Sequence, residues 1–175
     1  MRSSRTSLVV LLLVGVLLAG STDVGMATTD TASSTVTITF SEISELAVSG
    51  DPGTLTIVAP AAAGNLPADQ SDATTTMSWT ANVAAGLTRK VTGSLDVLFS
   101  GINLYATVAA PGGTDGTSAG EVQFAVGATA YDYVTAIGNC NVSAQTITFR
   151  ASVSAMVAPY TSTSQTVTWT LTEDA

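Results

Sequence analysis

The chain has no histidine, one cysteine and one lysine among its 175 residues. Without histidine it cannot form a histidine-based catalytic triad, an imidazole general base or a histidine zinc site. The single cysteine, Cys140, excludes an intrachain disulfide and has no histidine to activate it as a nucleophile. We therefore expect a protein that is not an enzyme and that needs no cofactor or metal.

Basic residues are scarce: five stand against thirteen acidic ones, for a net charge of −8. If residues 1–27 are removed, Arg2, Arg5 and Asp23 are lost and the net charge becomes −9. A chain this acidic cannot neutralise a run of phosphates, and an anionic membrane surface repels it. We expect no nucleic acid among its partners, and no membrane once the first residues are cleaved.

The N-terminal residues have the pattern of a secretory signal peptide. Two arginines in "MRSSRT" precede the apolar run "SLVVLLLVGVLLAG", which is short for a spanning helix and is followed by small residues. We predict cleavage after Ala27, with Ser21 as the alternative site. Residues 1–27 are then the signal peptide, the protein is extracellular or held at the cell surface, and the polar stretch 28–34 is a mobile leader.

Alternating apolar and polar residues dominate the rest of the chain, and no helical period follows the signal peptide. Turn residues separate the alternating stretches, and the helical crossovers that parallel strands require are absent. We predict one all-β domain over residues 35–175, an antiparallel β-sandwich of roughly eight strands, immunoglobulin-like or jelly-roll in type. The predicted strands lie in residues 35–40, 54–59, 74–83, 90–99, 102–109, 121–126, 146–157 and 166–172, with residues 131–135 as a further candidate.

The connections between these strands can also be predicted. Residues 60–73 and 111–120 have no periodicity and are rich in small and turn-forming residues, so both are expected to be long loops. Gly101 lies between two alternating stretches, which predicts a hairpin that joins residues 90–99 to residues 102–109.

The first predicted strand, "TVTITF", is apolar on one face through Val36, Ile38 and Phe40 and carries threonine on the other. Its pairing partner is left open, because such a strand can pair within its own sandwich or with a neighbouring molecule. Three further apolar residues are in register with apolar neighbours in later strands and are predicted to be core or to line the acceptor of a donated strand: Trp79, Trp169 and Leu171. The terminal strand that carries Trp169 either closes the core or borders the groove that receives a neighbour's residues 35–40.

The carboxylates do not suggest a catalytic site. Glycosidases need two carboxylates across a cleft, and the nearest pairs in sequence are Glu42 with Glu45 and Asp69 with Asp72. Neither pair is flanked by aromatic residues, so we interpret all four as exposed. Asp115, Asp69 and Asp72 lie in loops of the kind that supply calcium ligands, but their spacing does not match an EF-hand, and we predict no metal site.

Four other residues carry open questions. Tyr131 and Tyr133 in "YDY" are the best candidates for a ligand surface, such as a platform on which a sugar ring stacks. Asn141 begins an "NVS" glycosylation sequon, which matters only in an organism with that machinery. We interpret Cys140 as a small buried apolar side chain, with a bridge to a second chain as the alternative.

The last strand resembles the end of a WxL domain, the module by which secreted proteins of some Gram-positive bacteria attach to the cell wall. That family has a Trp-x-Leu motif near the C-terminus followed by an acidic residue, and Trp169, Leu171 and Glu173 match it. The family's earlier Trp-x-Leu is only half present, as Trp79 followed by Ala81. The resemblance implies a protein that binds cell-wall polysaccharide.

The layout of the chain resembles fibre-forming surface proteins that polymerise by donor-strand exchange, including TasA-like fibres and archaeal bundling pili. In those families an N-terminal strand leaves its own subunit and completes the sheet of the next. Here the segment that begins at Thr35 follows the predicted leader and has the necessary β-prone, one-sided apolar character.

We therefore expect an exported structural protein of the cell surface that self-associates into a filament through residues 35–40. A wall-binding or carbohydrate-binding module of the WxL type is the alternative.

Overall fold

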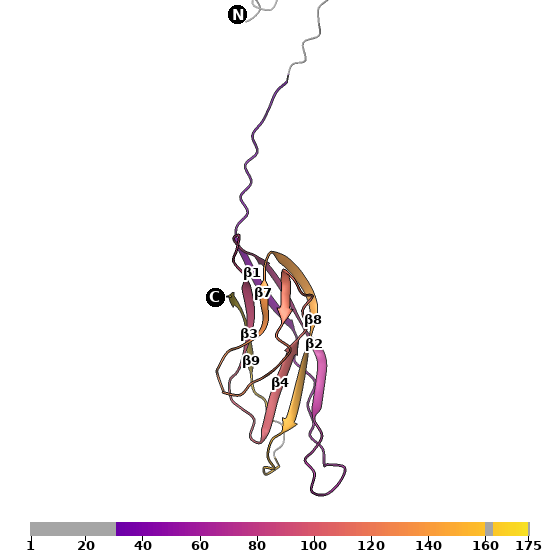
Figure 1. The fold of residues 1–175 in the computed structure, drawn as a ribbon. Helices are drawn as coiled ribbons and strands as arrows, with labels where there is room; N and C mark the ends of the chain where they lie inside the picture. The colour runs from indigo at the N-terminus through magenta and orange to yellow at the C-terminus, as the bar shows by residue number, and fades with distance from the viewer. Residues whose placement is uncertain (1–30, 160–162, 175) are drawn as a thin grey trace, which may run out of the picture. The chain divides into compact units, whose positions relative to one another are not determined.

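The computed structural model describes residues 31–159 and 163–174 (Figure 1). The predicted signal peptide, residues 1–27, and residues 28–30 of the predicted leader lie outside the described residues. The chain divides into two compact units, residues 1–39 and 40–175. All strands of the described residues belong to the second unit.

Nine strands and no helix occur in the described residues. The strands are β1 (Ile43–Ser49), β2 (Gln70–Asn82), β3 (Arg89–Leu95), β4 (Ile102–Val108), β5 (Asp115–Ser118), β6 (Glu121–Gln123), β7 (Tyr131–Ile137), β8 (Cys140–Val153) and β9 (Val167–Glu173).

The strands form two antiparallel sheets. The five-stranded sheet has the order β1-β2-β8-β4-β6, and the four-stranded sheet has the order β5-β7-β3-β9. Buried side chains from both sheets form one hydrophobic cluster, so the two sheets pack face to face around a shared core. The prediction of an all-β antiparallel sandwich is confirmed.

The core is built from the alternating positions of the longest strands. Met77, Trp79 and Ala81 of β2 are at most 3% exposed, and Ile147 and Phe149 of β8 are at most 4% exposed. The Trp79 indole donates a hydrogen bond of 3.0 Å to the Asp115 carbonyl, which satisfies its buried N–H and ties β2 to β5 of the opposite sheet.

Two alanines adopt left-handed backbone conformations where the strand register shifts. Ala144 of β8 has φ 52° beside the shift between β2 and β8, and its N–H donates to the Ser78 hydroxyl at 3.0 Å. Ala136 of β7 has φ 56° beside the shift between β3 and β7, and its N–H donates to the Asp174 carboxylate at 3.2 Å. Side chains thus satisfy the amides that these bulges remove from the ladders.

Several sequence-based predictions about single strands are wrong. Residues 35–40 and 54–59 form no strand, because no strand edge pairs with either of them. Residues 43–49, which lack clean alternation, form β1, and part of the predicted loop 111–120 forms β5. The loop predicted at residues 60–73 ends earlier, because β2 begins at residue 70.

The predicted hairpin between residues 90–99 and 102–109 is also wrong. β3 pairs with β7 and β9, whereas β4 pairs with β6 and β8, so the two strands belong to different sheets. The connection between them passes from one sheet to the other, and Val97, inside the predicted strand 90–99, lies within this connection and is 56% exposed. Gly101 does occupy a turn, with φ 67°.

Candidate assembly site

The segment 35–40 leaves an apolar face uncovered. It forms no strand, and the side chains of Val36, Ile38 and Phe40 are 77%, 85% and 76% exposed. Three apolar side chains at alternate positions form one row along a strand, and leaving that row in water is unfavourable by the apolar area it exposes. A segment with this pattern is ready to pair with a sheet edge.

The chain is fixed to the sandwich directly after this segment. The Asn82 side chain at the end of β2 donates to the Ser41 carbonyl at 2.9 Å and accepts from the Ile43 N–H. The Glu42 carboxylate forms an ion pair with Arg89 at the start of β3. Residues 41–43 are therefore anchored at the end of the sandwich where β1 and β3 begin and where β2 and β9 end.

The terminal strand β9 is the matching feature in the sandwich. It pairs along its full length with β3, from Arg89 opposite Glu173 to Leu95 opposite Val167, and with no other strand of the described residues. It is therefore an edge strand. Val167, Trp169 and Leu171 pack against the core but stay partly exposed, because no further strand covers them on the open side.

Trp169 is held by an aromatic cluster. Its ring meets Tyr133 edge to face at 4.9 Å between centroids, and Phe124 and Phe149 both lie at 6.4 Å. Gly93 of β3 makes this arrangement possible, since a Cβ there would lie 2.6 Å from the Trp169 ring and 2.8 Å from the Tyr133 ring. Trp169 therefore packs on the core although it lies on an edge strand of the sandwich.

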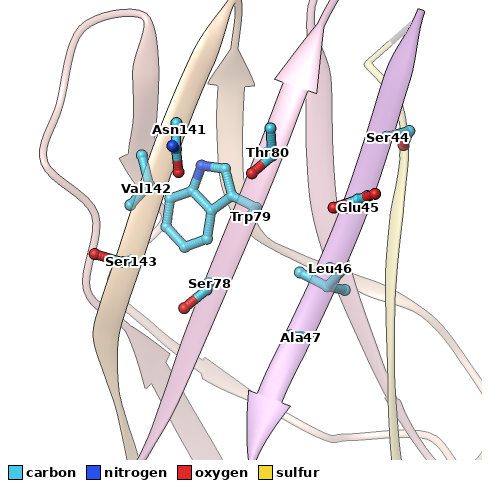
Figure 2. Close-up of a pocket in the computed structure, with 10 residues that line it drawn as sticks. All are labelled: Ser44, Glu45, Leu46, Ala47, Ser78, Trp79, Thr80, Asn141, Val142 and Ser143. Carbon is cyan, nitrogen blue, oxygen red and sulfur yellow. The ribbon is translucent and has the colours of Figure 1, made fainter.

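The edge of the other sheet lies beside β9. Parts of β1 and β9 approach within 8 Å between Cα atoms, but no backbone hydrogen bond joins them in the described ranges. Figure 2 shows β9, in pale yellow, next to β1. On β1, Leu46 packs partly buried against the core and Val48 is 38% exposed. The two edge strands therefore border one side of the sandwich on which apolar side chains are incompletely covered.

The remaining two sheet edges are short. β6 comprises three residues and β5 comprises four, against seven each in β1 and β9. In addition, Glu121 of β6 is engaged by Arg150 through two hydrogen bonds of 2.6 and 2.7 Å. Short and charged edges are poor templates for an added strand.

The predicted ligand surface at Tyr131 and Tyr133 is wrong for Tyr133. Its side chain is completely buried between Phe124 and Trp169, and burial raises the pKa of its hydroxyl far above the ordinary value. Tyr131 is partly buried and packs against the same core. The two tyrosines point inward together because residues two apart in a strand share a face.

The carboxylates that lie close together in the sequence do not share one site in the structure. Asp69 and Glu121 both pair with Arg150, whose guanidinium lies 4.1 Å from the centre of the Tyr105 ring. Hydrogen bonds lower the pKa of both carboxyls, from Ser152 foremost at Asp69 and from Arg150 foremost at Glu121. The sequence pattern did not single out Arg150, because nothing local predicts which charges meet on one face of a sheet.

Asp72, Glu42 and Glu45 have other neighbours. Hydrogen bonds from the Thr74 side chain and backbone lower the pKa of Asp72, whereas Glu42 pairs with Arg89. Glu45 lies on β1 beside an open depression that crosses β1, β2 and β8 on the five-stranded sheet (Figure 2). Small polar side chains surround the depression, including Ser78, Thr80 and Asn141, and Figure 2 places no second carboxylate among its ten residues.

Cys140 begins β8 and is partly buried, and burial raises the pKa of its thiol. Within residues 31–159 and 163–174, no three histidine, cysteine or acidic side chains are grouped as metal ligands. No helix in that part of the chain is both long and apolar enough to cross a membrane.

Comparison of the chain with known protein families, curated proteins and solved structures finds no match.

Proposed function

We propose that this protein is an exported structural subunit of the cell surface that assembles into a filament by strand donation through residues 35–40. One observation carries the proposal: an alternating segment with an exposed apolar face precedes a sandwich that has a long, incompletely covered edge. Each feature is costly to leave open in water, and pairing the two between molecules removes both costs.

The opposite end of the sandwich also fits an end-to-end assembly. Exposed apolar side chains lie in the connections that follow β3, β6 and β8: Val97, Leu98, Val126, Met156 and Val157. β3 ends and β4 begins at this end, far from the anchor of residues 41–43. A contact between unlike ends is heterologous, and such a contact builds an open filament when the rotation between copies does not close a ring.

The proposal is tested by negative-stain electron microscopy of the chain from residue 28 onward over a range of concentrations. We expect filaments from the unchanged protein and none from the Ile38→Lys variant, because a charge on the donated face would be buried in the neighbour. The matched variant Thr39→Lys places the same charge on the opposite face and should still form filaments. Uniform monomers at every concentration, or filaments from Ile38→Lys, would contradict the proposal.

The wall-binding alternative has weaker support. Trp169 and Leu171 of the WxL-like motif are partly buried against the core, so only part of each side chain is open to a polysaccharide. If the protein stays monomeric but is retained on isolated cell walls, this alternative replaces the filament proposal.

A further inference from the structure

We infer that the acceptor of residues 35–40 is the free edge of β9 in a second copy of this chain, paired antiparallel with Ile38 opposite Trp169. This inference rests on the proposed function and specifies its interface. It follows from the length of the available edges, the chemistry of their two faces, the direction of the chain and the register.

Only two sheet edges in the described part of the chain are long enough to be the acceptor. Among the described residues the sheets end in β1, β6, β5 and β9, and only β1 and β9 are long enough to pair with the whole six-residue segment. Both border the same incompletely covered side of the sandwich. The choice therefore depends on how well each edge matches the donated segment.

The chemistry of the faces favours β9. Its core-facing residues are Val167, Trp169 and Leu171, and the opposite face carries only threonine at positions 168, 170 and 172. The donated segment has the same arrangement, with three apolar residues on one face and three threonines on the other. Pairing the two extends an apolar inner face and a threonine outer face at once, and cross-strand threonine pairs are favourable.

β1 offers a poorer match. Its residues on the core side pair with Met77, Trp79 and Ala81 of β2 and are Val48, Leu46 and Ser44, so one of the three is polar. The outward positions include Glu45, whose charge would lie beside the threonines of the donor.

The direction of the chain also favours β9. The donor is anchored at the end where β9 finishes, so in an end-to-end stack it enters the next subunit at the opposite end, where β9 begins. Phe40, next to the anchor, then lies near the start of β9, and Val36 lies towards its end. This direction is antiparallel to β9 and parallel to β1, and every strand pair in the described sheets is antiparallel.

One register matches all the apolar residues. A shift of one residue would turn the donor's apolar face to solvent, so only shifts of two are allowed. Among those, a single register places each apolar donor residue opposite an apolar residue of β9: Val36 with Leu171, Ile38 with Trp169 and Phe40 with Val167. The outward threonines then pair as Thr37 with Thr170 and Thr39 with Thr168.

Disulfide cross-linking between two differently tagged chains tests this interface. Both chains carry Cys140→Ser; a tagged chain adds Thr37→Cys and an untagged chain adds Thr170→Cys. Residues directly opposite in an antiparallel pair are close enough for a disulfide. After mixing and mild oxidation, we expect a covalent heterodimer of distinct size as the main product, whereas Thr37→Cys mixed with the out-of-register Thr172→Cys should give little.

The control places the acceptor cysteine on β1 in place of β9. Mixing Thr37→Cys with Ala47→Cys, an outward position on β1, should leave the chains uncoupled. Filaments whose Thr37→Cys chains couple to Ala47→Cys, or that form without coupling to Thr170→Cys, would overturn the β9 assignment and leave the filament proposal standing. The absence of both filaments and coupling, in variants whose circular dichroism matches the unchanged protein, would overturn the filament proposal as well.

Discussion

Two stretches of this chain are nearly the same in sequence and differ in structure. Residues 35–40 read Thr-Val-Thr-Ile-Thr-Phe, and residues 166–171 read Thr-Val-Thr-Trp-Thr-Leu. The second forms most of β9, paired with β3 and packed on the core. The first forms no strand and exposes its apolar face. Alternation therefore records the capacity to form a strand, whereas pairing depends on whether the fold brings an edge to the segment.

The largest expected effect is on the free energy of unfolding, which a substitution in residues 166–171 should lower and a substitution in residues 35–40 should not. Trp169→Ala should lower the free energy of unfolding by about 3 kcal/mol, the lower end of the range for buried aromatic truncations, because Trp169 is partly exposed. Ile38→Ala should leave it unchanged, since Ile38 is 85% exposed. Urea unfolding at concentrations that keep the protein monomeric measures both. Equal losses in the two variants would mean that residues 35–40 pack within their own chain.

A second variant tests how β9 is held in place. Gly93→Ala should cost about 1–3 kcal/mol of stability, because the added methyl would overlap the rings of Trp169 and Tyr133. Gly138→Ala is the matched control, since the nearest atom to its new Cβ lies 3.5 Å away, at an ordinary contact distance. If Gly93→Ala unfolds at the same urea concentration as the control, the aromatic cluster is not packed over Gly93 as described.

The smallest effect is a pH dependence confined to the sandwich. The pKa of Asp69 is lowered by Ser152 and then by Arg150, and the pKa of Glu121 is lowered chiefly by Arg150, so these contacts stabilise the fold fully above the ordinary values of 3.8 and 4.5. This contribution is lost as the pH falls through the lower values of the folded state. Residues 35–40 contain no titratable side chain and should not respond.

Comparing urea midpoints near neutral pH and near pH 3 measures this effect. The unchanged protein should lose more stability on acidification than Glu121→Gln, in which one of the two carboxylates no longer titrates. An equal loss in both proteins would show that the Arg150 pairs contribute nothing to acid sensitivity.

The sequence predicted the parts of the fold that local pattern determines. Trp79 alternates with polar residues on a strand that is paired on both sides, so its burial could be predicted from the pattern alone. The pairing of the strands could not: β3 and β4 are adjacent in sequence and lie in different sheets. The packing of the whole sandwich decides which strands pair, and the turn between β3 and β4 does not.

The candidate site shows the same division. The apolar face of residues 35–40 is visible in the sequence, but the free edge of β9 is a property of topology alone. Tyr133 illustrates the limit most clearly, because its aromatic ring suggested a stacking surface for a ligand and the aromatic cluster around Trp169 buries it completely. The meeting of Arg150 with Asp69 and Glu121 likewise required the sheet register.

Hydrogen–deuterium exchange, read by mass spectrometry on peptides that cover residues 35–40 and 166–171, tests the central claim most directly. In the dilute monomer we predict fast exchange in residues 35–40 and protection in residues 166–171, and on assembly residues 35–40 should become protected as well. Protection of residues 35–40 already in the monomer, or fast exchange that persists in the filament, would contradict the account.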